Sequence, residues 1–264
     1  MKKGITSNVL KLIAVILVLI DHSGMYLYKN MTEETYDILR GIGRMAMPVF
    51  LYLLIQGFFY TKNIKKYILR LFVLATVTQI ILVILGYINA TYHPEYWTSV
   101  NNYLGVLYSY TLSLVILTAI DRKVVLDSID ENKNIIIRIN MIVIAILVYL
   151  KIKIEFDMRI PFMAVELYAI EKLFCKNGEL ISKQKDVSII RKMLYLISIF
   201  IVLALSLIYV NYSSGNKYMV LASIVLIALY NGEKGKDSQI IKYLFYLFFP
   251  IQHAIFYLLG MGVI

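Results

Sequence analysis

The chain alternates between long apolar segments and short polar connections. Nine apolar segments fall at about residues 8–28, 36–60, 64–88, 102–120, 134–151, 159–173, 190–210, 217–231 and 242–262. A helix needs about 20 apolar residues to cross a bilayer, so most segments are long enough to span. The sixth and eighth are short, and one of them is expected to be tilted, re-entrant or partly buried. The pattern predicts an all-α integral membrane protein, a polytopic bundle of about nine transmembrane helices in a single domain, 1–264.

Composition strengthens this prediction. Hydrophobic residues make up 60% of the chain and charged residues only 17%, whereas soluble domains average about a quarter charged. The net charge of +10 needs no nucleic-acid partner, because membrane proteins concentrate basic residues in cytoplasmic loops. The single cysteine, Cys175, excludes an intramolecular disulfide and a thiolate metal cluster.

The distribution of Lys and Arg predicts the orientation. Basic residues gather at the N-terminus and in every second loop: Lys2, Lys3, Lys62, Lys65, Lys66, Arg122, Lys123, Lys133, Lys176, Lys183, Lys185, Arg191, Lys192, Lys234, Lys236 and Lys242. The alternate loops are poor in such residues. The rule that basic loops stay inside places the N-terminus in the cytoplasm and the C-terminus outside. The N-terminal run lacks a small-residue cleavage site, so we interpret it as a retained first helix. An excess of Ile, Lys, Asn and Tyr is typical of AT-rich bacterial genomes, and we expect the bacterial cytoplasmic (inner) membrane.

The loop "NATYHPEYWTSVNNY", which begins at Asn89, carries three tyrosines and the sole tryptophan. It is expected on the outer face, where aromatic side chains form an interfacial belt. A lid that binds an acceptor substrate is the alternative. His93 within it is interpreted as a solvated loop histidine.

Ionisable residues inside apolar segments carry the functional signal, because they are costly in lipid. Asp21 and His22 lie together in the outer half of the first helix. An acid beside an imidazole can fix its tautomer and stabilise its charged form, as a general base requires. Successive helical residues point about 100° apart, so the two side chains need not touch. Lys11 shares a face with His22 about 16 Å away along the axis, where it either snorkels to the interface or holds anionic phosphates.

The second segment contains "RGIGRMAMPVF". Arg40 and Arg44 are one turn apart on one face. Pro48 removes the hydrogen bond that the carbonyl of Arg44 would accept, which predicts a kink. Gly41 and Gly43 permit a close helix approach. Arg40 could snorkel, whereas Arg44 lies deeper and needs a partner: Asp21, Glu166 or a negatively charged ligand.

Further polar residues complete the set of candidates. Gln56 precedes a basic cytoplasmic rim that includes Lys62 and Lys65. Glu166 lies seven residues after Arg159 on one face, where an ion pair is the simpler explanation. In "YLFFPIQHAIF", Pro250 predicts a kink, and Gln252 and His253 fall near mid-bilayer.

Several chemistries have no motif in this chain. The sequence contains no Gly-rich phosphate loop, no HExxH and no GxSxG. Its three histidines lie in three different segments, so no metal site is expected.

The stretches "LKLIAVILVLIDHSG", "LRGIGRMAMPVFLYLLIQGFFYTKNIKKYILRL" and "LYNGEKG…KYLFYLFFPIQHAIFYLL" resemble the TraX family, named for an F-pilin N-acetylating membrane protein. That family is similar to the acyltransferase-3 membrane acetyltransferases, which carry a basic residue and a histidine eleven apart on the first helix. Lys11 and His22 keep this spacing, with Lys in place of Arg. The family usually has a histidine two residues after the last proline, whereas Gln252 holds that place here and His253 follows.

The resemblance implies an acyltransferase that uses acetyl-CoA as co-substrate. His22 would be the general base, assisted by Asp21, and Arg40 and Arg44 would hold anionic donor groups or the oxyanion. Lys11 and the rim residues Lys62 and Lys65 would bind the phosphates of acetyl-CoA. Gln56, Glu166, Gln252 and His253 would contact substrate. The acceptor would be a peptide N-terminus or a cell-surface glycan. The alternative is a membrane protein without enzymatic activity, either a transporter or a partner in secretion or pilus assembly.

The orientation can be tested with single cysteines engineered into a variant that lacks Cys175. We expect cysteines at residues 63 and 186 to react with a membrane-impermeant thiol reagent only after permeabilisation, and a cysteine at residue 95 to react in intact cells. Labelling of residue 95 only after permeabilisation would reverse the predicted orientation.

Overall fold

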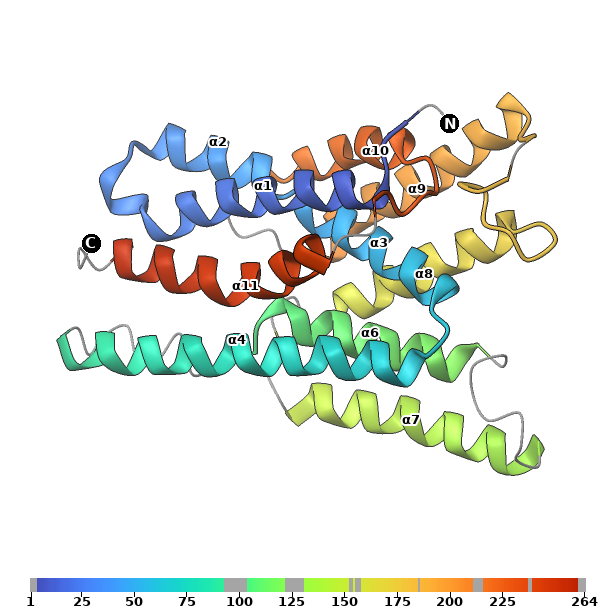
Figure 1. Ribbon diagram of the computed structural model, residues 1–264, viewed down its shortest axis with the longest axis horizontal. Coiled ribbons are helices and arrows are strands. Elements are labelled where there is room, and N and C mark those ends of the chain that lie inside the picture. Colours follow the sequence, from blue (N-terminus) through green and yellow to red (C-terminus); the bar gives the residue numbers. More distant parts are fainter. Residues whose placement is uncertain are drawn as a thin grey trace. The chain divides into compact units, whose positions relative to one another are not determined.

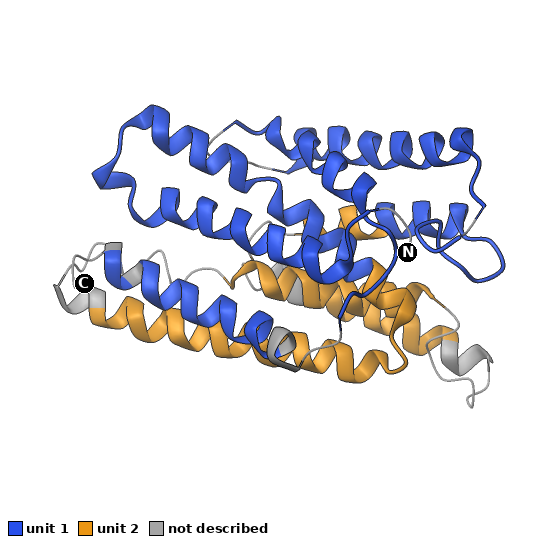
Figure 2. Ribbon diagram, turned by 45° about the horizontal axis from the view of Figure 1, so that its top comes forward, with its two compact units in different colours: residues 1–55, 166–264 blue, residues 56–165 orange. Residues whose placement is uncertain are grey.

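A computed structural model describes residues 4–92, 104–121, 131–151, 154, 158–184, 186–210, 216–236 and 239–260. These residues are almost entirely helical, and their β pairing is limited to three isolated bridges. The fold divides into two compact units, residues 1–55 with 166–264, and residues 56–165 (Figure 2). The prediction of a single domain remains untested, since compactness alone does not show independent folding.

The first unit contains most of the helices. They are α1 (Ser7–Tyr26), the short 3₁₀ helix η1 (Tyr28–Asn30), α2 (Glu33–Gly43), most of α3 (Ala46–Tyr60), the second half of α8 (Arg159–Phe174), α9 (Ile189–Tyr209), α10 (Met219–Leu229) and α11 (Gln239–Gly260) (Figure 1). The second unit contains the C-terminal end of α3 and the first half of α8. It also contains α4 (Ile64–Tyr92), α6 (Val106–Ile120) and α7 (Glu131–Lys151).

Each predicted segment corresponds to helix, which confirms a helical membrane protein at the level of the fold. Among the described residues, four stretches are long and apolar enough to cross a bilayer: Ser7–Tyr26, Glu33–Tyr60, Ile64–Ile88 and Ile189–Tyr209. Shorter apolar helices cover Val106–Ile120, Ile135–Leu147, Met219–Leu229 and Tyr243–Phe256. The count of nine spans and their orientation remain predictions.

The segment predicted at 36–60 is interrupted, as Pro48 indicated. Helix α2 ends at Gly43, and α3 begins at Ala46 after a turn at Arg44 and Met45. Proline disfavours the helical bond to the residue four positions earlier, which here is Arg44. The break places Arg44 at the C-cap of α2, where a cation interacts favourably with the helix dipole.

Helices α1 and α2 pack closely enough that one glycine is required. A Cβ added at Gly43 would overlap the backbone and side chain of Asp21, and one at Gly24 would lie 3.2 Å from Cδ of Arg40. The predicted role of Gly43 in close helix approach is thereby confirmed.

The core of the first unit lies between α1 and α3. Leu10 and Ala14 of α1 pack with Val49 and Leu53 of α3, all buried. The opposite side of α1 exposes large apolar side chains, among them Leu12 and Ile16. A helix that is apolar on all sides suits a bilayer, where one face packs on protein and the other meets lipid.

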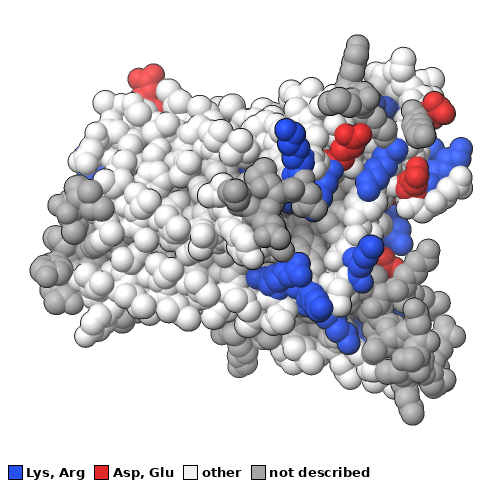
Figure 3. Space-filling view, in the orientation of Figure 1, with Lys and Arg blue, Asp and Glu red and all other residues white. Residues whose placement is uncertain are grey.

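Three basic segments meet at one end of this unit. Ile5 pairs with Tyr230, and the amides of Ser7 and Asn8 donate to the carbonyls of Glu233 and Lys234. A Cβ at Gly232, whose φ is +79°, would overlap the carbonyl of Ser182 in the preceding basic loop. On the face drawn in Figure 3, Lys and Arg gather on the right, beside a broad area without charged side chains. Basic segments of this kind are typical of loops on the cytoplasmic side of a membrane, and the orientation of the chain remains a prediction.

In the second unit, α6 packs against α4 and α7. Gln79 of α4 accepts a hydrogen bond from the amide of Gly105, and the hydroxyl of Tyr108 donates to Thr76. Arg138 of α7 donates to the carbonyls of Ala119 and Ile120, so it satisfies the end of α6. The hypothesis of an aromatic lid falls mainly on residues 93–103, outside the described residues.

Replacement of Gly43 by alanine tests the close contact of α1 and α2. Because the added Cβ must displace Asp21, we expect a loss of about 1–3 kcal/mol in unfolding free energy, measured by thermal or SDS denaturation in detergent. Gly105→Ala is the matched control, since its nearest new neighbour is Oε1 of Gln79 at 3.8 Å. Equal stability of the two variants would contradict the contact.

Candidate functional site

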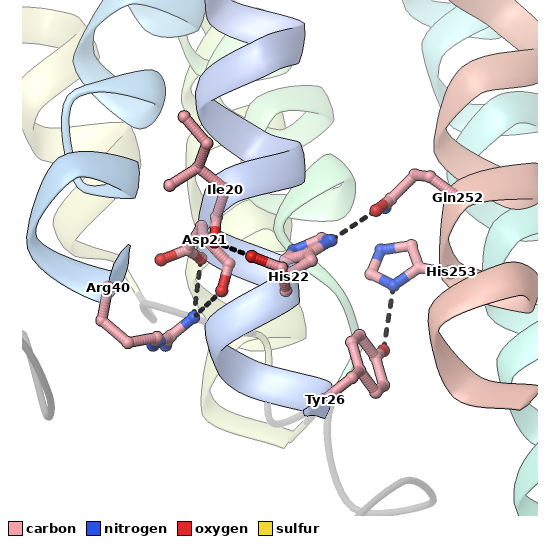
Figure 4. Close-up of polar contacts among 8 residues, drawn as sticks. Ile20, Asp21, His22, Tyr26, Arg40, Gln252 and His253 are labelled. Atoms are coloured by element: carbon pink, nitrogen blue, oxygen red, sulfur yellow. Dashed lines mark hydrogen bonds and ion pairs between the residues drawn. The ribbon is translucent and has the colours of Figure 1, made fainter. Parts of the chain in front are cut away.

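Polar side chains from three helices of the first unit gather near the end of α1. Asp21, His22 and Tyr26 come from α1, Arg40 from α2, and the pair Gln252 and His253 from α11 (Figure 4). His22 and Gln252 are 230 positions apart in the sequence, and the packing of α1 against α2 and α11 brings these groups together.

Asp21 forms an ion pair with Arg40. The distance from Nη1 of Arg40 to Oδ2 of Asp21 is 2.7 Å, and the same nitrogen lies 3.3 Å from the Asp21 carbonyl. The side chains are 9% and 17% exposed for Arg40 and Asp21. Removal of one partner from such a desolvated pair strongly destabilises the fold, because the other charge is left uncompensated.

His22 points away from Asp21, towards α11 (Figure 4). Its Nδ1 lies 2.6 Å from Oε1 of Gln252. An amide oxygen only accepts hydrogen bonds, so this contact assigns the proton to Nδ1 and leaves a lone pair on Nε2. A neutral imidazole held in this tautomer can accept a proton at Nε2.

The second imidazole lies beside the first. The ring centroids of His22 and His253 are 4.6 Å apart, with an angle of 38° between the planes. The hydroxyl of Tyr26 is hydrogen-bonded to Nδ1 of His253 at 3.0 Å. The ring of Tyr26 also stacks on that of Phe256, with 6.2 Å between the ring centroids, and this contact orients the tyrosine. The arrangement is a histidine pair held at one edge by an amide and at the other by a phenol.

Two buried polar atoms at this cluster have no hydrogen-bond partner among the described residues. They are Oδ1 of Asp21 and Nε2 of Gln252. Buried polar atoms are nearly always satisfied, so each such atom requires an explanation, and a ligand that binds there is one. One atom is an acceptor and the other a donor.

The cluster contains five of the candidate site residues predicted from the sequence: Asp21, His22, Arg40, Gln252 and His253. Their roles remain predictions, and two contacts bear on them. Asp21 bonds to Arg40 and not to the His22 ring, as the angle of about 100° between successive helical residues allows. Arg40, expected to bind anionic donor groups, has its guanidinium engaged by a carboxylate of the protein.

The remaining candidates have other surroundings or belong to the second unit. The Lys11 ammonium sits 5.8 Å from the centre of the Phe245 ring, as a cation–π pair. Arg44 is buried at the C-cap of α2. Glu166 accepts a hydrogen bond from Tyr209 at 2.7 Å. Buried Gln56 and the exposed Lys62 and Lys65 belong to the second unit, so their parts in the site stay predictions.

A second polar cluster was not predicted from the sequence. Tyr195 donates to the carboxylate of Glu171, and the hydroxyl of Tyr52 is 3.0 Å from that of Tyr195. The two tyrosines line a pocket of about 270 Å³ at the basic end of the unit, with Lys192 and Asn231. Glu171 was detectable as an ionisable residue inside the segment 159–173, and Tyr26 as a polar group one turn after His22.

No group of three or more potential metal-ligating side chains (His, Cys, Asp or Glu) occurs among the described residues. The cluster around His22 is therefore described by acid–base and hydrogen-bonding groups: two imidazoles, one amide, one phenol and one ion pair.

These features define a helical membrane protein with a partly buried histidine pair between two of its helices. Residues 6–260 match the family model described as TraX protein, and the chain belongs to this family. A stretch of 70 residues is 36% identical to the "Probable fimbrial assembly protein FimC, serogroup H1" of Dichelobacter nodosus. This match covers 26% of the chain and 28% of the relative. No solved structure matches the chain.

The ion pair can be tested with a double-mutant cycle in detergent. We expect Asp21→Asn and Arg40→Gln each to lower the unfolding free energy by about 1–3 kcal/mol, because each leaves one charge poorly solvated. The double variant should lose clearly less than the sum, since no charge is then left without its partner. Additive losses would show that the two side chains act independently.

Proposed function

We propose that the protein is a membrane-embedded acetyltransferase that moves an acetyl group from cytosolic acetyl-CoA to an amine or hydroxyl acceptor. The observation that carries this proposal is His22, a partly buried imidazole whose Nδ1 is bonded to Gln252 at 2.6 Å. A general base needs a fixed tautomer with a lone pair available to the acceptor, and a proton held on Nδ1 by Gln252 supports such a role for Nε2.

The reaction requires one proton to move in each direction. Nε2 of His22 takes the proton from the acceptor as its nitrogen or oxygen bonds to the acetyl carbonyl carbon. The carbon–sulfur bond of the thioester then breaks, and the imidazolium returns the proton to the departing thiolate. The charge of Asp21, although paired with Arg40, lies next along the chain and favours the imidazolium.

Donor binding involves the basic residues. Lys11 lies about three helical turns from His22 along α1, roughly 16 Å. We assign Lys11 to the phosphates of acetyl-CoA, and Arg44 to a donor anion or the oxyanion. The pantetheine arm would extend from these residues towards His22.

The acceptor is a peptide N-terminus or a cell-surface glycan. Family membership and a relative named as a fimbrial assembly protein support a role in pilus biogenesis at the bacterial cytoplasmic membrane. They equally support a second candidate, a pilus assembly partner without enzymatic activity. In that case the buried charges and histidines would be structural.

His22 variants separate catalysis from folding. In purified protein, we expect His22→Ala and His22→Gln to reduce acetyl transfer, measured as thiol release from acetyl-CoA, by about 10²–10⁴-fold. Both should retain helix content and binding of a non-hydrolysable acetyl-CoA analogue. Glutamine does not rescue because it cannot take up a proton.

Two outcomes would overturn the proposal. Full activity of a folded His22→Ala protein would remove His22 from catalysis and direct attention to His253. Failure of the wild type to bind acetyl-CoA at millimolar concentration would favour the assembly partner.

A further inference from the structure

The amide of Gln252 uses only one of its two ends within the described residues. Its Oε1 accepts from His22, and its Nε2 is buried without a hydrogen-bond partner there. The residue is 4% exposed, so bulk water does not satisfy this nitrogen. An unsatisfied buried donor costs about 1–3 kcal/mol, a cost that a bound ligand with an acceptor atom would remove.

Two other donors near His22 are already engaged. Nη1 of Arg40 donates to Asp21, and the Tyr26 hydroxyl is bonded to His253. Gln252 therefore supplies a neutral donor directly beside the proposed base. The amide is planar, so the bond that aligns the imidazole also fixes the direction of the Nε2 hydrogens.

We propose that Gln252 is a catalytic residue whose Nε2 donates a hydrogen bond to the carbonyl oxygen of the acyl donor. This inference rests on the proposed function and adds to it the group that polarises the thioester. The carbonyl oxygen gains negative charge as the acceptor attacks, so the bond strengthens in the transition state. Removal of one such donor commonly lowers kcat by about 10²–10³-fold.

Two substitutions separate this role from alignment of His22. Gln252→Glu keeps an oxygen that accepts from Nδ1 but has no amide donor. Gln252→Met has a similar length and provides neither group. If Nε2 contacts the carbonyl, both variants lose about 10²–10³-fold in kcat for thiol release from acetyl-CoA, with KM for acetyl-CoA little changed. If Gln252 only aligns the imidazole, Glu rescues the activity that Met loses.

The matched control is Gln79→Met, which removes the amide of a helical glutamine in the second unit that bonds to Gly105. We expect its kcat to stay near that of the wild type. Unfolding temperature and binding of the non-hydrolysable analogue should verify that the Gln252 variants are folded, because Gln252→Met leaves Nδ1–H of His22 without its acceptor.

The failures of the two proposals are distinguishable. Near wild-type kcat in Gln252→Glu, with an inactive His22→Ala, would overturn the role of Nε2 and leave the acetyltransferase intact. A wild type that neither binds acetyl-CoA nor releases its thiol would overturn both. Loss of kcat in both Gln252 variants, with the analogue still bound, supports the inference.

Discussion

The ion pair between Asp21 and Arg40 determines how α1 sits in its unit. A carboxylate and a guanidinium that are mostly removed from water stabilise each other when they face one another, because an uncompensated charge is costly in an apolar bundle. Gly43 lets α2 approach Asp21 closely enough for the pair to form. Once Asp21 faces α2, helical geometry turns His22 by about 100°, and it meets Gln252 and His253 of α11. The charges thus orient the imidazole without contacting it.

This arrangement gives the two neighbouring residues of α1 different tasks. Asp21 joins α1 to α2, and His22 carries the chemistry that we propose. Removal of Asp21 should therefore affect folding as well as activity, whereas removal of His22 should affect activity alone. Measurements of stability and turnover on the same variants are needed for either residue to be assigned.

The first unit has polar clusters at two levels. The histidine cluster lies near the C-terminal end of α1, and the Tyr52–Tyr195–Glu171 cluster lies towards its N-terminal end, where Tyr230 pairs with Ile5. Between them, Leu10 and Ala14 pack against α3. In lipid, an apolar layer separates polar sites because each must be satisfied within the protein.

The sequence by itself determined the helical membrane class, the approximate bounds of the helices, the break near Pro48 and the choice of Asp21, His22, Gln252 and His253 as candidate site residues. These follow from local rules: segment length, the geometry of proline, and the cost of an ionisable group in lipid. The tertiary structure decided which of these groups meet. His22 and Gln252 are adjacent only because α1 and α11 pack together. The ion pair of Arg40 with Asp21 depends on which face α1 turns towards α2, and the spacing of Arg40 and Arg44 does not predict it. Periodicity assigns a residue to a face of its own helix, but the partner of that face depends on long-range packing, for which a single sequence carries no local signal.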